Sequence, residues 1–230
     1  MTTSPDTPAL PAEGVRVAFV GKGGSGKSTI IGYLLGHLAE DGVPVAALDA
    51  DEPGDEEAGS LVEWADLAPL GGPVYPAPAR LALRERAKAL TPPGGLLVMD
   101  TGAWVRKAGG THFAALASVD VVVLTMAPTR MELDRAGSVL AALDHLTEVG
   151  AHCPRLVICL TMVNPSAASA DETEKTLADA GYRVLSTRVP RSDARDGYGQ
   201  AFGRTPRLVA GSPMDLLAAE LVAVAAEDAG

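Results

Sequence analysis

The stretch Gly21-Lys-Gly-Gly-Ser-Gly-Lys-Ser-Thr29 decides the fold of this chain. It satisfies the phosphate-binding pattern G-x-x-x-x-G-K-[ST] and lies between an apolar run over residues 15–20 and a helical pattern over residues 28–40. Glycines allow backbone N–H groups to surround phosphate oxygens, and the N-terminus of the following helix adds partial positive charge. The stretch therefore predicts a nucleotide-binding P-loop, with ATP and Mg²⁺ as cofactors.

Most residues of this loop have a predicted role. Lys27 is expected to reach the β- and γ-phosphates as a catalytic residue, Ser28 to ligate Mg²⁺, and Thr29 to donate to the α-phosphate. The pattern requires one lysine, whereas this loop has two, so Lys22 needs a separate explanation. The residues predicted to contact ATP here are Gly23, Gly24, Ser25, Gly26, Lys27, Ser28 and Thr29.

Apolar runs alternate with amphipathic segments along the rest of the chain. This alternation predicts an α/β fold, a doubly wound and mostly parallel sheet with helices on both faces, whose ligands bind at the carboxyl ends of the strands. The predicted strands cover residues 15–20, 43–49, 95–100, 121–125, 155–161 and 182–186.

Two later helices have recognisable starts. Ser169 with Glu172 fits a capping box, and Asp171 with Lys175 has the spacing of an i,i+4 ion pair, in a helix that ends near residue 181. Ser212 is predicted to cap the last helix, with proline at its first position. Its predicted buried face comprises Leu217, Leu221 and Val224.

Composition limits what these motifs mean. With 230 residues, 47% of them hydrophobic, the chain can bury one sizeable core, so a single P-loop ATPase domain is expected over residues 15–230. Residues 1–14 are aperiodic and rich in proline and threonine, which predicts a disordered N-terminal tail. No apolar run reaches about 18 residues and no signal peptide is recognisable, so a cytoplasmic protein is expected.

The cysteines and tryptophans are interpreted first as structural residues. The spacing of Cys153 and Cys159 fits neither a zinc knuckle nor a redox pair. Trp64 and Trp104 follow the acidic motifs closely, and we expect them to lie in the core and not at an interaction surface.

Three aspartates lie at the ends of predicted strands. Asp100 closes the strand over residues 95–100 and is placed to hold Mg²⁺ through water. Asp49 and Asp51 project toward the same edge, where one of them could orient the attacking water. A strand-end aspartate is equally typical of a helix cap, but two such sites beside a P-loop favour catalysis.

The combined motifs resemble those of ParA/MinD-type deviant Walker ATPases, most of all the small ParF-like ParA proteins. Residues 22–28 match the signature K-G-G-x-G-K-[ST], residues 49–51 resemble the D-x-D-P motif, and residues 97–102 resemble the Walker B motif. Residues 127–137 resemble the loop and helix that follow Walker B. The late nucleotide loop of the family resembles residues 189–192 together with residues 202–206.

This resemblance implies an explanation for Lys22. The family forms ATP-bound sandwich dimers in which the signature lysine crosses to the phosphates of the other subunit, so Lys22 would be catalytic in trans. Asp51 would position the water, and Asp49 would support Mg²⁺ or its water shell. Glu52 stands where the family has proline, in an acidic segment over residues 49–57 that would repel the γ-phosphate. Slow hydrolysis that depends on a partner is therefore expected.

Recognition of the base is predicted on two loops. Asn164 lies where relatives present a base-reading asparagine, and its amide can donate to and accept from a purine edge. Asn before Pro is equally common in turns, so both interpretations stay open. Pro190 and Arg191 are expected to cover the base from the other side.

The resemblance also implies partners and a location. These are a ParB-like centromere-binding protein and nonspecific DNA, with nucleoid association when ATP is bound, in the partition of a plasmid or chromosome. The net charge of −10 opposes binding to a polyanion except through a local basic patch. Candidate contacts are Arg80, Arg84, Arg86 and Lys88 in one predicted helix, and Arg191, Arg195, Arg204 and Arg207 near the late loop.

Other functions of related proteins are weighed against this one. Residues 218–230 contain no Lys or Arg, which argues against the basic membrane helix of MinD. The cysteines lie away from the loops, which argues against an iron–sulfur reductase. Two alternatives remain: an ATPase that positions another cargo on a protein scaffold, and a metabolic P-loop ligase or kinase of the dethiobiotin-synthetase kind.

Overall fold

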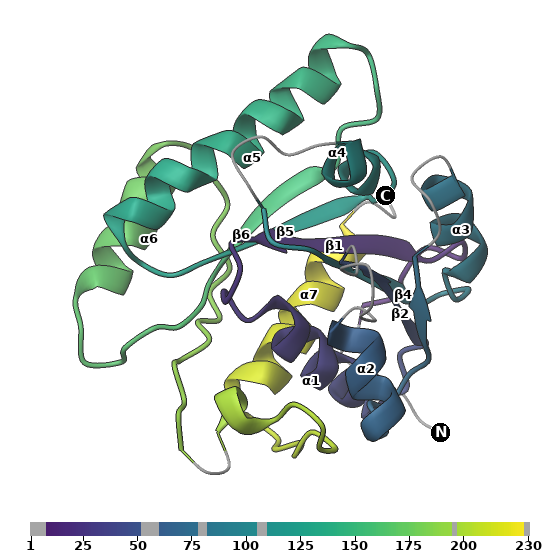
Figure 1. Cartoon of the computed structure of the whole chain (residues 1–230). Coiled ribbons are helices and arrows are strands. Elements are labelled where there is room, and N and C mark those ends of the chain that lie inside the picture. Colours follow the sequence, from purple (N-terminus) through teal and green to yellow (C-terminus); the bar gives the residue numbers. More distant parts are fainter. Residues whose placement is uncertain (1–7, 52–59, 78–81, 105–109, 195–196, 228–230) are drawn as a thin grey trace.

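The core of the fold is a six-stranded, fully parallel sheet (Figure 1). The computed structural model describes residues 8–51, 60–77, 82–104, 110–194 and 197–227. The strand order is β3-β2-β4-β1-β5-β6. The bounds are β1 Val15–Gly21, β2 Val45–Ala50, β3 Val74–Pro76, β4 Leu96–Thr101, β5 Val121–Met126 and β6 Arg155–Leu160.

Helices cover both faces of this sheet (Figure 1). Helices α1, α2 and α7 pack on one face, and α3, α4, α5 and α6 pack on the other. The predicted fold class is therefore confirmed. The bounds are α1 Lys27–Glu40, α2 Ser60–Leu67, α3 Leu83–Leu90, α4 Gly110–Leu116, α5 Arg130–Glu148, α6 Ser169–Asp179 and α7 Pro213–Ala226, with a 3₁₀ turn, η2, at Tyr198–Gln200.

The central strands are apolar on both sides because helices cover both sides. In β1, Val17 and Phe19 face the core under α1 and α7, whereas Ala18 and Val20 face the core under α5. The alternation of side chains along a strand produces this division. Continuous apolar runs are therefore the sequence signature of these strands.

Two strand predictions differ from the structure. Residues 182–186 form no strand: Val184 makes one isolated bridge to Ile158, and the chain continues alongside β6 to a second isolated bridge between Val163 and Pro190. Leu185 is nevertheless buried, so the apolar pattern there predicts burial and not a ladder. Conversely, the edge strand β3 has only three residues and escaped prediction, since so short a segment shows no periodicity.

The predicted disordered tail is corrected over part of its length. Leu10 packs against the core beneath α1 and α7, and the N–H of Gly94 donates to the carbonyl of Ala12 at 3.0 Å. Residues 8–14 are thus attached to the fold, because an apolar residue and a backbone acceptor both find partners. Residues 1–7 lie outside the described part.

The helix starts agree with prediction in one case and differ in the other. Ser212 caps α7 by accepting the N–H of Asp215, and the predicted apolar face is buried. The capping box at Ser169 is wrong, because Ala168 is the capping residue and makes no side-chain cap bond. The Asp171–Lys175 pair is also absent among the described contacts, since these side chains pair instead with Arg188 and Asp179.

The remaining structural expectations divide in the same way. Trp64 and Cys159 are buried as expected, whereas Cys153 is exposed at the surface. Trp104 is 9% exposed. None of the described helices combines the length and apolarity needed to span a bilayer.

Candidate nucleotide-binding site

The P-loop connects β1 to α1 at the carboxyl edge of the sheet. Gly24 and Gly26 have φ angles of +80° and +89°, in the left-handed region that favours glycine. Gly26 is the N-cap of α1 and has no side chain to satisfy the first N–H groups of the helix. These donors stay available to a bound anion, as a phosphate site requires.

Lys27 is folded inward over its own loop. Its Nζ donates to the carbonyl of Gly21 at 3.2 Å and to that of Lys22 at 3.4 Å, and the residue is 7% exposed. Burial lowers the pKa of Lys27, while the charges of Asp100 and Asp51 oppose that shift. A buried ammonium that donates to carbonyl oxygens can exchange them for phosphate oxygens at little cost in solvation.

Asp100 at the end of β4 is buried, 1% exposed, and neither carboxylate oxygen has a hydrogen-bond partner among the described residues. Burial raises its pKa to about 7; the nearby Ser28 hydroxyl and Lys27 oppose that rise, and Asp49 and Asp51 add to it. A buried carboxylate without a hydrogen-bond partner, beside the Ser28 hydroxyl, is suited to bind a metal ion.

The hydroxyl and carboxylate oxygens at this place are donors that suit Mg²⁺. No cluster of three or more His, Cys, Asp or Glu side chains that could hold a metal occurs in the described ranges. Mg²⁺ in nucleotide sites needs few protein ligands, because phosphates and waters complete its octahedron. Ser28 and Asp100 are therefore sufficient as the protein's share of such a site, and they fit it.

Asp49 lies beside Asp100 in the register of β2 and β4, but its carboxylate is fully engaged. One oxygen accepts the N–H of Asp51 at 3.1 Å, and the other accepts the N–H groups of Leu61 and Val62 at 2.9 Å. Asp49 thus caps α2 from a distance. Its predicted role at Mg²⁺ stays a prediction, and the helix-cap alternative describes these contacts.

Asp51 is half-buried and lies close to Gly102 in the loop after β4. A Cβ built on Gly102 would come within 2.4 Å of Asp51 Oδ1, so a side chain at position 102 would displace the Asp51 carboxylate. The backbone N–H of Asp51 donates to Asp49, and Asp51 thus lies between the Asp49 carboxylate and the Walker B loop. Glu52 and the acidic residues up to position 57 lie outside the described residues.

The other loop residues divide between the two sides of the P-loop. Ser25 Oγ lies 2.8 Å from Thr125 Oγ1, which anchors the loop to β5. Ser28 Oγ lies 3.0 Å from Ser60 Oγ at the start of α2. Thr29 lines a small cavity of about 60 Å³ between α1 and the loop after β6. Gly23 is exposed and lines a different, larger cavity.

The predicted base-binding residues are only partly brought together. Pro190 and Arg191 line the small cavity beside Thr29, whereas Asn164 does not. Asn164 Oδ1 instead accepts the N–H and the hydroxyl of Ser166 at 3.1 and 2.8 Å, which is an Asx turn. Met162, which sequence reasoning missed, lines the cavity with a φ of +53°, a left-handed value that is uncommon outside glycine.

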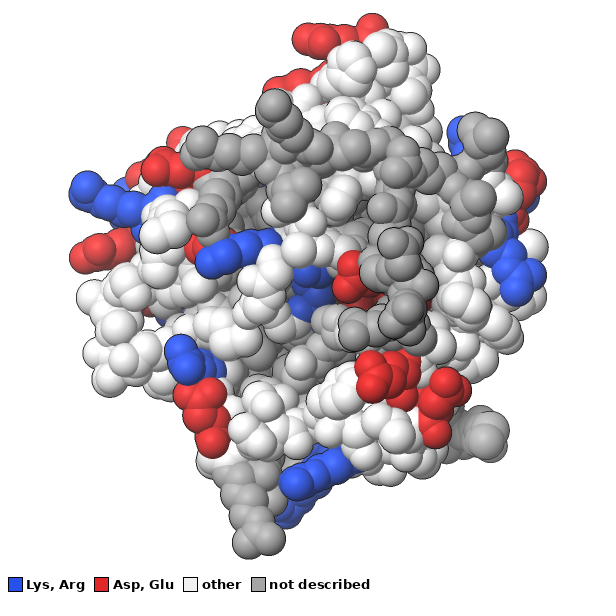
Figure 2. Space-filling model, viewed as in Figure 1, with Lys and Arg blue, Asp and Glu red and all other residues white. Residues whose placement is uncertain are grey.

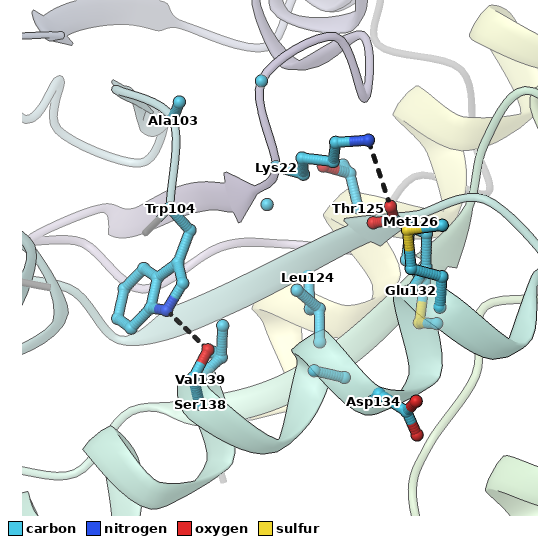
Figure 3. A pocket seen from close by; sticks show the side chains of 14 residues that line it. Lys22, Ala103, Trp104, Leu124, Thr125, Met126, Glu132, Asp134, Ser138 and Val139 are labelled. Carbon is cyan, nitrogen blue, oxygen red and sulfur yellow. Dashed lines mark hydrogen bonds and ion pairs between the residues drawn. The ribbon is translucent and has the colours of Figure 1, made fainter. Parts of the chain in front are cut away.

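Lys22 extends from the P-loop toward helix α5. Its Nζ lies 3.5 Å from Glu132 Oε1 of α5, and its side chain is 49% exposed (Figure 3). Sequence reasoning did not single out Glu132. The sequence signal that could have indicated Glu132 is its spacing from Thr129, which is typical of a helix start. Thr129 caps α5 by accepting the N–H of Glu132.

The predicted DNA-contacting residues do not form one cluster. On the face in Figure 2, basic side chains are dispersed among acidic ones. Arg191 pairs with Asp193 at 2.7 Å, whereas Arg204 and Arg207 are exposed beside a cavity of about 250 Å³. The α3 candidates Arg84, Arg86 and Lys88 are exposed, and Arg86 lies over Tyr75; Arg80 and Arg195 lie outside the described residues.

Known proteins share both the sequence pattern and the fold of this chain. The family model for the CobQ/CobB/MinD/ParA nucleotide binding domain matches residues 17–197. A stretch of 142 residues is 34% identical to the carbon monoxide dehydrogenase accessory protein CooC of Rhodospirillum rubrum. That match covers 60% of this chain and 44% of the relative, so it spans less than half of the relative's length.

Two solved structures illustrate the shared fold. The ATP complex of a Cyanothece McdA variant has a TM-score of 0.64 at 17% identity, covering 93% of this chain and 96% of that one. The cobyrinic acid a,c-diamide synthase of Mycobacterium smegmatis with a bound ATP analogue and magnesium has a TM-score of 0.63 at 17% identity, covering 83% and 91%. Identities this low establish the fold and nothing further.

Proposed function

This chain belongs to the CobQ/CobB/MinD/ParA nucleotide binding domain family, and on that premise we propose that it is a Mg²⁺-ATP-dependent switch ATPase of the ParA type. A single P-loop domain over residues 15–230 would carry the activity. The observation that supports this most is the different placement of the two lysines of the loop. Lys27 is buried inside the loop, whereas Lys22 lies outside it, half-exposed, where a second subunit can be reached.

The residues inside the loop would bind and cleave ATP. Lys27 moves from the carbonyls of Gly21 and Lys22 to the β- and γ-phosphates. Ser28 and Asp100 are the residues that would hold Mg²⁺, which would supply charge neutralisation. Asp51, which lies close to Gly102, orients the water that attacks the γ-phosphorus and releases ADP and phosphate.

Lys22 would connect this chemistry to association. On ATP binding it leaves Glu132 and reaches the phosphates held by a second copy, so that charge in the transition state is fully neutralised only in the dimer. Hydrolysis by the protein alone is then slow, and a partner that stabilises the closed dimer accelerates it.

The output of the switch is proposed to be DNA partition of the ParA kind, ParF-like in size. The ATP dimer would hold nonspecific DNA and associate with the nucleoid, and a ParB-like protein would trigger release. Doubling the exposed Arg84, Lys88, Arg204 and Arg207 in a dimer would concentrate basic charge that a monomer with net charge −10 lacks.

Retention of nonspecific duplex DNA at moderate salt tests this proposal. Protein loaded with ATP should retain DNA, while ADP-loaded protein and the Lys22→Ala variant should not. Lys175→Ala is a matched control, because Lys175 is an exposed lysine of α6 paired with Asp179, on an element that does not line the P-loop. If the ATP-dependent dimer forms without retaining DNA, the switch stands and the DNA output fails.

A second candidate output is an accessory role for another protein. The 34% identity to CooC, described as a carbon monoxide dehydrogenase accessory protein, supports an ATPase that acts on a protein partner or scaffold. A P-loop enzyme acting on a small molecule is supported by the cavity beside Lys22 and by the fold shared with cobyrinic acid a,c-diamide synthase. Phosphate release with no DNA retention, followed by a search for a consumed substrate, separates these candidates.

A further inference from the structure

A second cavity, of about 490 Å³, is lined by Lys22 and Gly23 of the P-loop (Figure 3). Its size falls within the range of about 300–1,000 Å³ that small-molecule sites occupy. It is bounded by the P-loop, the loop after β4, strand β5 and helix α5. Its apolar walls are formed by Trp104, Leu124, Met126, Met131 and Val139.

The aromatic wall of this cavity is fixed in place. Trp104 Nε1 donates to Ser138 Oγ at 3.0 Å, and its backbone N–H donates to the carbonyl of Gly21 at 2.9 Å. Trp104 is therefore tied to α5 on one side and to the P-loop on the other. A pre-formed wall lowers the entropic cost of binding, since little has to be ordered when a ligand arrives.

The charged groups of the cavity lie at its rim. Lys22 and Glu132 form an ion pair across from Trp104 (Figure 3). The Glu132 side chain is 11% exposed, whereas that of Lys22 is 49% exposed. Asp134 adds a second carboxylate, so the described lining residues include two negative groups and one positive group. Glu132 is the less solvated of the two partners, and as a carboxylate at the rim it attracts cations.

We propose that this cavity binds a small organic cation with an apolar body, and that the bound cation releases Lys22 from Glu132. The ammonium group of the ligand pairs with Glu132, and its apolar body covers Trp104 and Met126. Lys22 is then free to reach a second subunit. By linkage, ATP-dependent dimerisation tightens ligand binding to the same degree that the ligand tightens the dimer.

The binding half of this inference stands without the proposed function; the coupling half rests on the role of Lys22 in trans. An ion pair with one half-exposed partner stabilises the protein only slightly. Opening the Lys22–Glu132 pair is therefore expected to change the dimer constant by a factor of up to about five per subunit. Two pairs open when a dimer closes. The expected tightening of the dimer is therefore on the order of ten-fold.

Binding is tested with cyclohexylmethylamine at neutral pH, where it is a cation. The chain has two tryptophans, so the ¹⁵N-labelled protein gives two indole N–H signals, assigned with Trp104→Phe. The amine should shift the Trp104 signal saturably and leave that of Trp64 in place. Cyclohexylmethanol and cyclohexanecarboxylate are the matched neutral and anionic probes. An unmoved Trp104 signal, or equal shifts from all three probes, would overturn the site.

Coupling is tested by the ATP-dependent dimer constant from sedimentation. Glu132→Gln should tighten the dimer several-fold and abolish the effect of the amine, while Glu148→Gln, a charge removed at the far end of α5, should do neither. If the amine binds but neither the amine nor Glu132→Gln changes the dimer constant from that of the amine-free wild-type protein, the coupling is overturned. If no ATP dimer forms at all, the proposed function fails and the cavity result stands. Consumption of the amine in the presence of Mg²⁺-ATP would make the cavity a substrate site and overturn the effector role.

Discussion

Asp49 and Asp100 occupy the same level of two neighbouring parallel strands and have opposite environments. Both are buried, 3% and 1% exposed, and they are register partners between β2 and β4. The carboxylate of Asp49 accepts three backbone N–H groups, two of them from the start of α2. The carboxylate of Asp100 accepts none from the described residues.

This difference distinguishes a structural aspartate from one prepared for a ligand. Burial raises the pKa of both groups, but the N–H groups of Val62, Asp51 and Leu61 oppose the rise at Asp49. Asp100 has no such donors, and its pKa reaches about 7. A buried carboxylate without donors destabilises the fold when it ionises, unless a metal ion or Lys27 compensates.

The largest expected effect comes from Asp100→Asn. The pKa of Asp100 is about 7 in the folded state and 3.8 in the unfolded chain, so the folded state binds the extra proton between these values. Stability therefore falls as pH rises from about 4 to 7, by at most about 4 kcal/mol. At pH 8, Asp100→Asn should raise the free energy of unfolding of the nucleotide-free protein by up to that amount.

Urea unfolding at pH 8 and pH 5 measures this gain, which should shrink at the lower pH. The same variant should bind Mg²⁺-nucleotide roughly 10- to 100-fold more weakly, the range found when a group orienting a bound metal is lost. If Asp100→Asn destabilises the protein at pH 8, the contrast with Asp49 is broken.

Asp49→Ala should have the next largest effect, and in the opposite direction. Three backbone N–H groups, two of them at the start of α2, lose a charged acceptor, which costs about 2–4 kcal/mol. For a chain of this size the melting temperature should fall by roughly 5–15 °C. Asp49→Asn keeps an acceptor oxygen and should lose less. If Asp49→Ala keeps normal stability but loses Mg²⁺ binding, Asp49 would instead be a metal ligand, as Asp100 is proposed to be.

Gly102→Ala should have the smallest effect on stability and sharpens the comparison at Asp51. The added Cβ would lie 2.4 Å from Asp51 Oδ1, so Asp51 must move, at a cost of about 1 kcal/mol. ATP hydrolysis should fall while nucleotide affinity, measured by calorimetry, stays the same, because Asp51 is proposed to act on water.

Gly137→Ala is the control for Gly102→Ala. A Cβ on Gly137 meets no atom within 4 Å, and the residue lies inside α5. Alanine there should stabilise the helix by roughly 0.5–1 kcal/mol and leave hydrolysis unchanged. Equal hydrolysis rates in both variants would contradict the proposed role of Asp51.

The local parts of the fold were predictable because their signals are local. The P-loop pattern, the five long strands and the cap at Ser212 each depend on residues close together in the chain. The strand β3 and the isolated bridge at Val184 depend on distant partners. Val74, Tyr75 and Pro76 become a strand only because β2 offers them an open edge.

The site follows the same division. Sequence spacing predicts Lys27, Ser28 and Asp100 at one sheet edge, since the carboxyl ends of parallel strands and the start of α1 meet there. It does not predict that Asp49 is occupied by α2, because its donors lie 12 and 13 residues further along. Nor does it reveal the contact of Lys22 with Glu132, which lie far apart in the chain and meet through the packing of α5 beside β5.

The sequence by itself determined the P-loop, the parallel sheet and the presence of two lysines where the pattern needs one. Only the tertiary structure decided that Lys27 faces inward and Lys22 outward, and that one of two equivalent aspartates is satisfied while the other is not. The reason is physical. Hydrogen-bonding pattern and periodicity are properties of neighbouring residues, whereas desolvation and charge pairing depend on every group that folding brings to the same place.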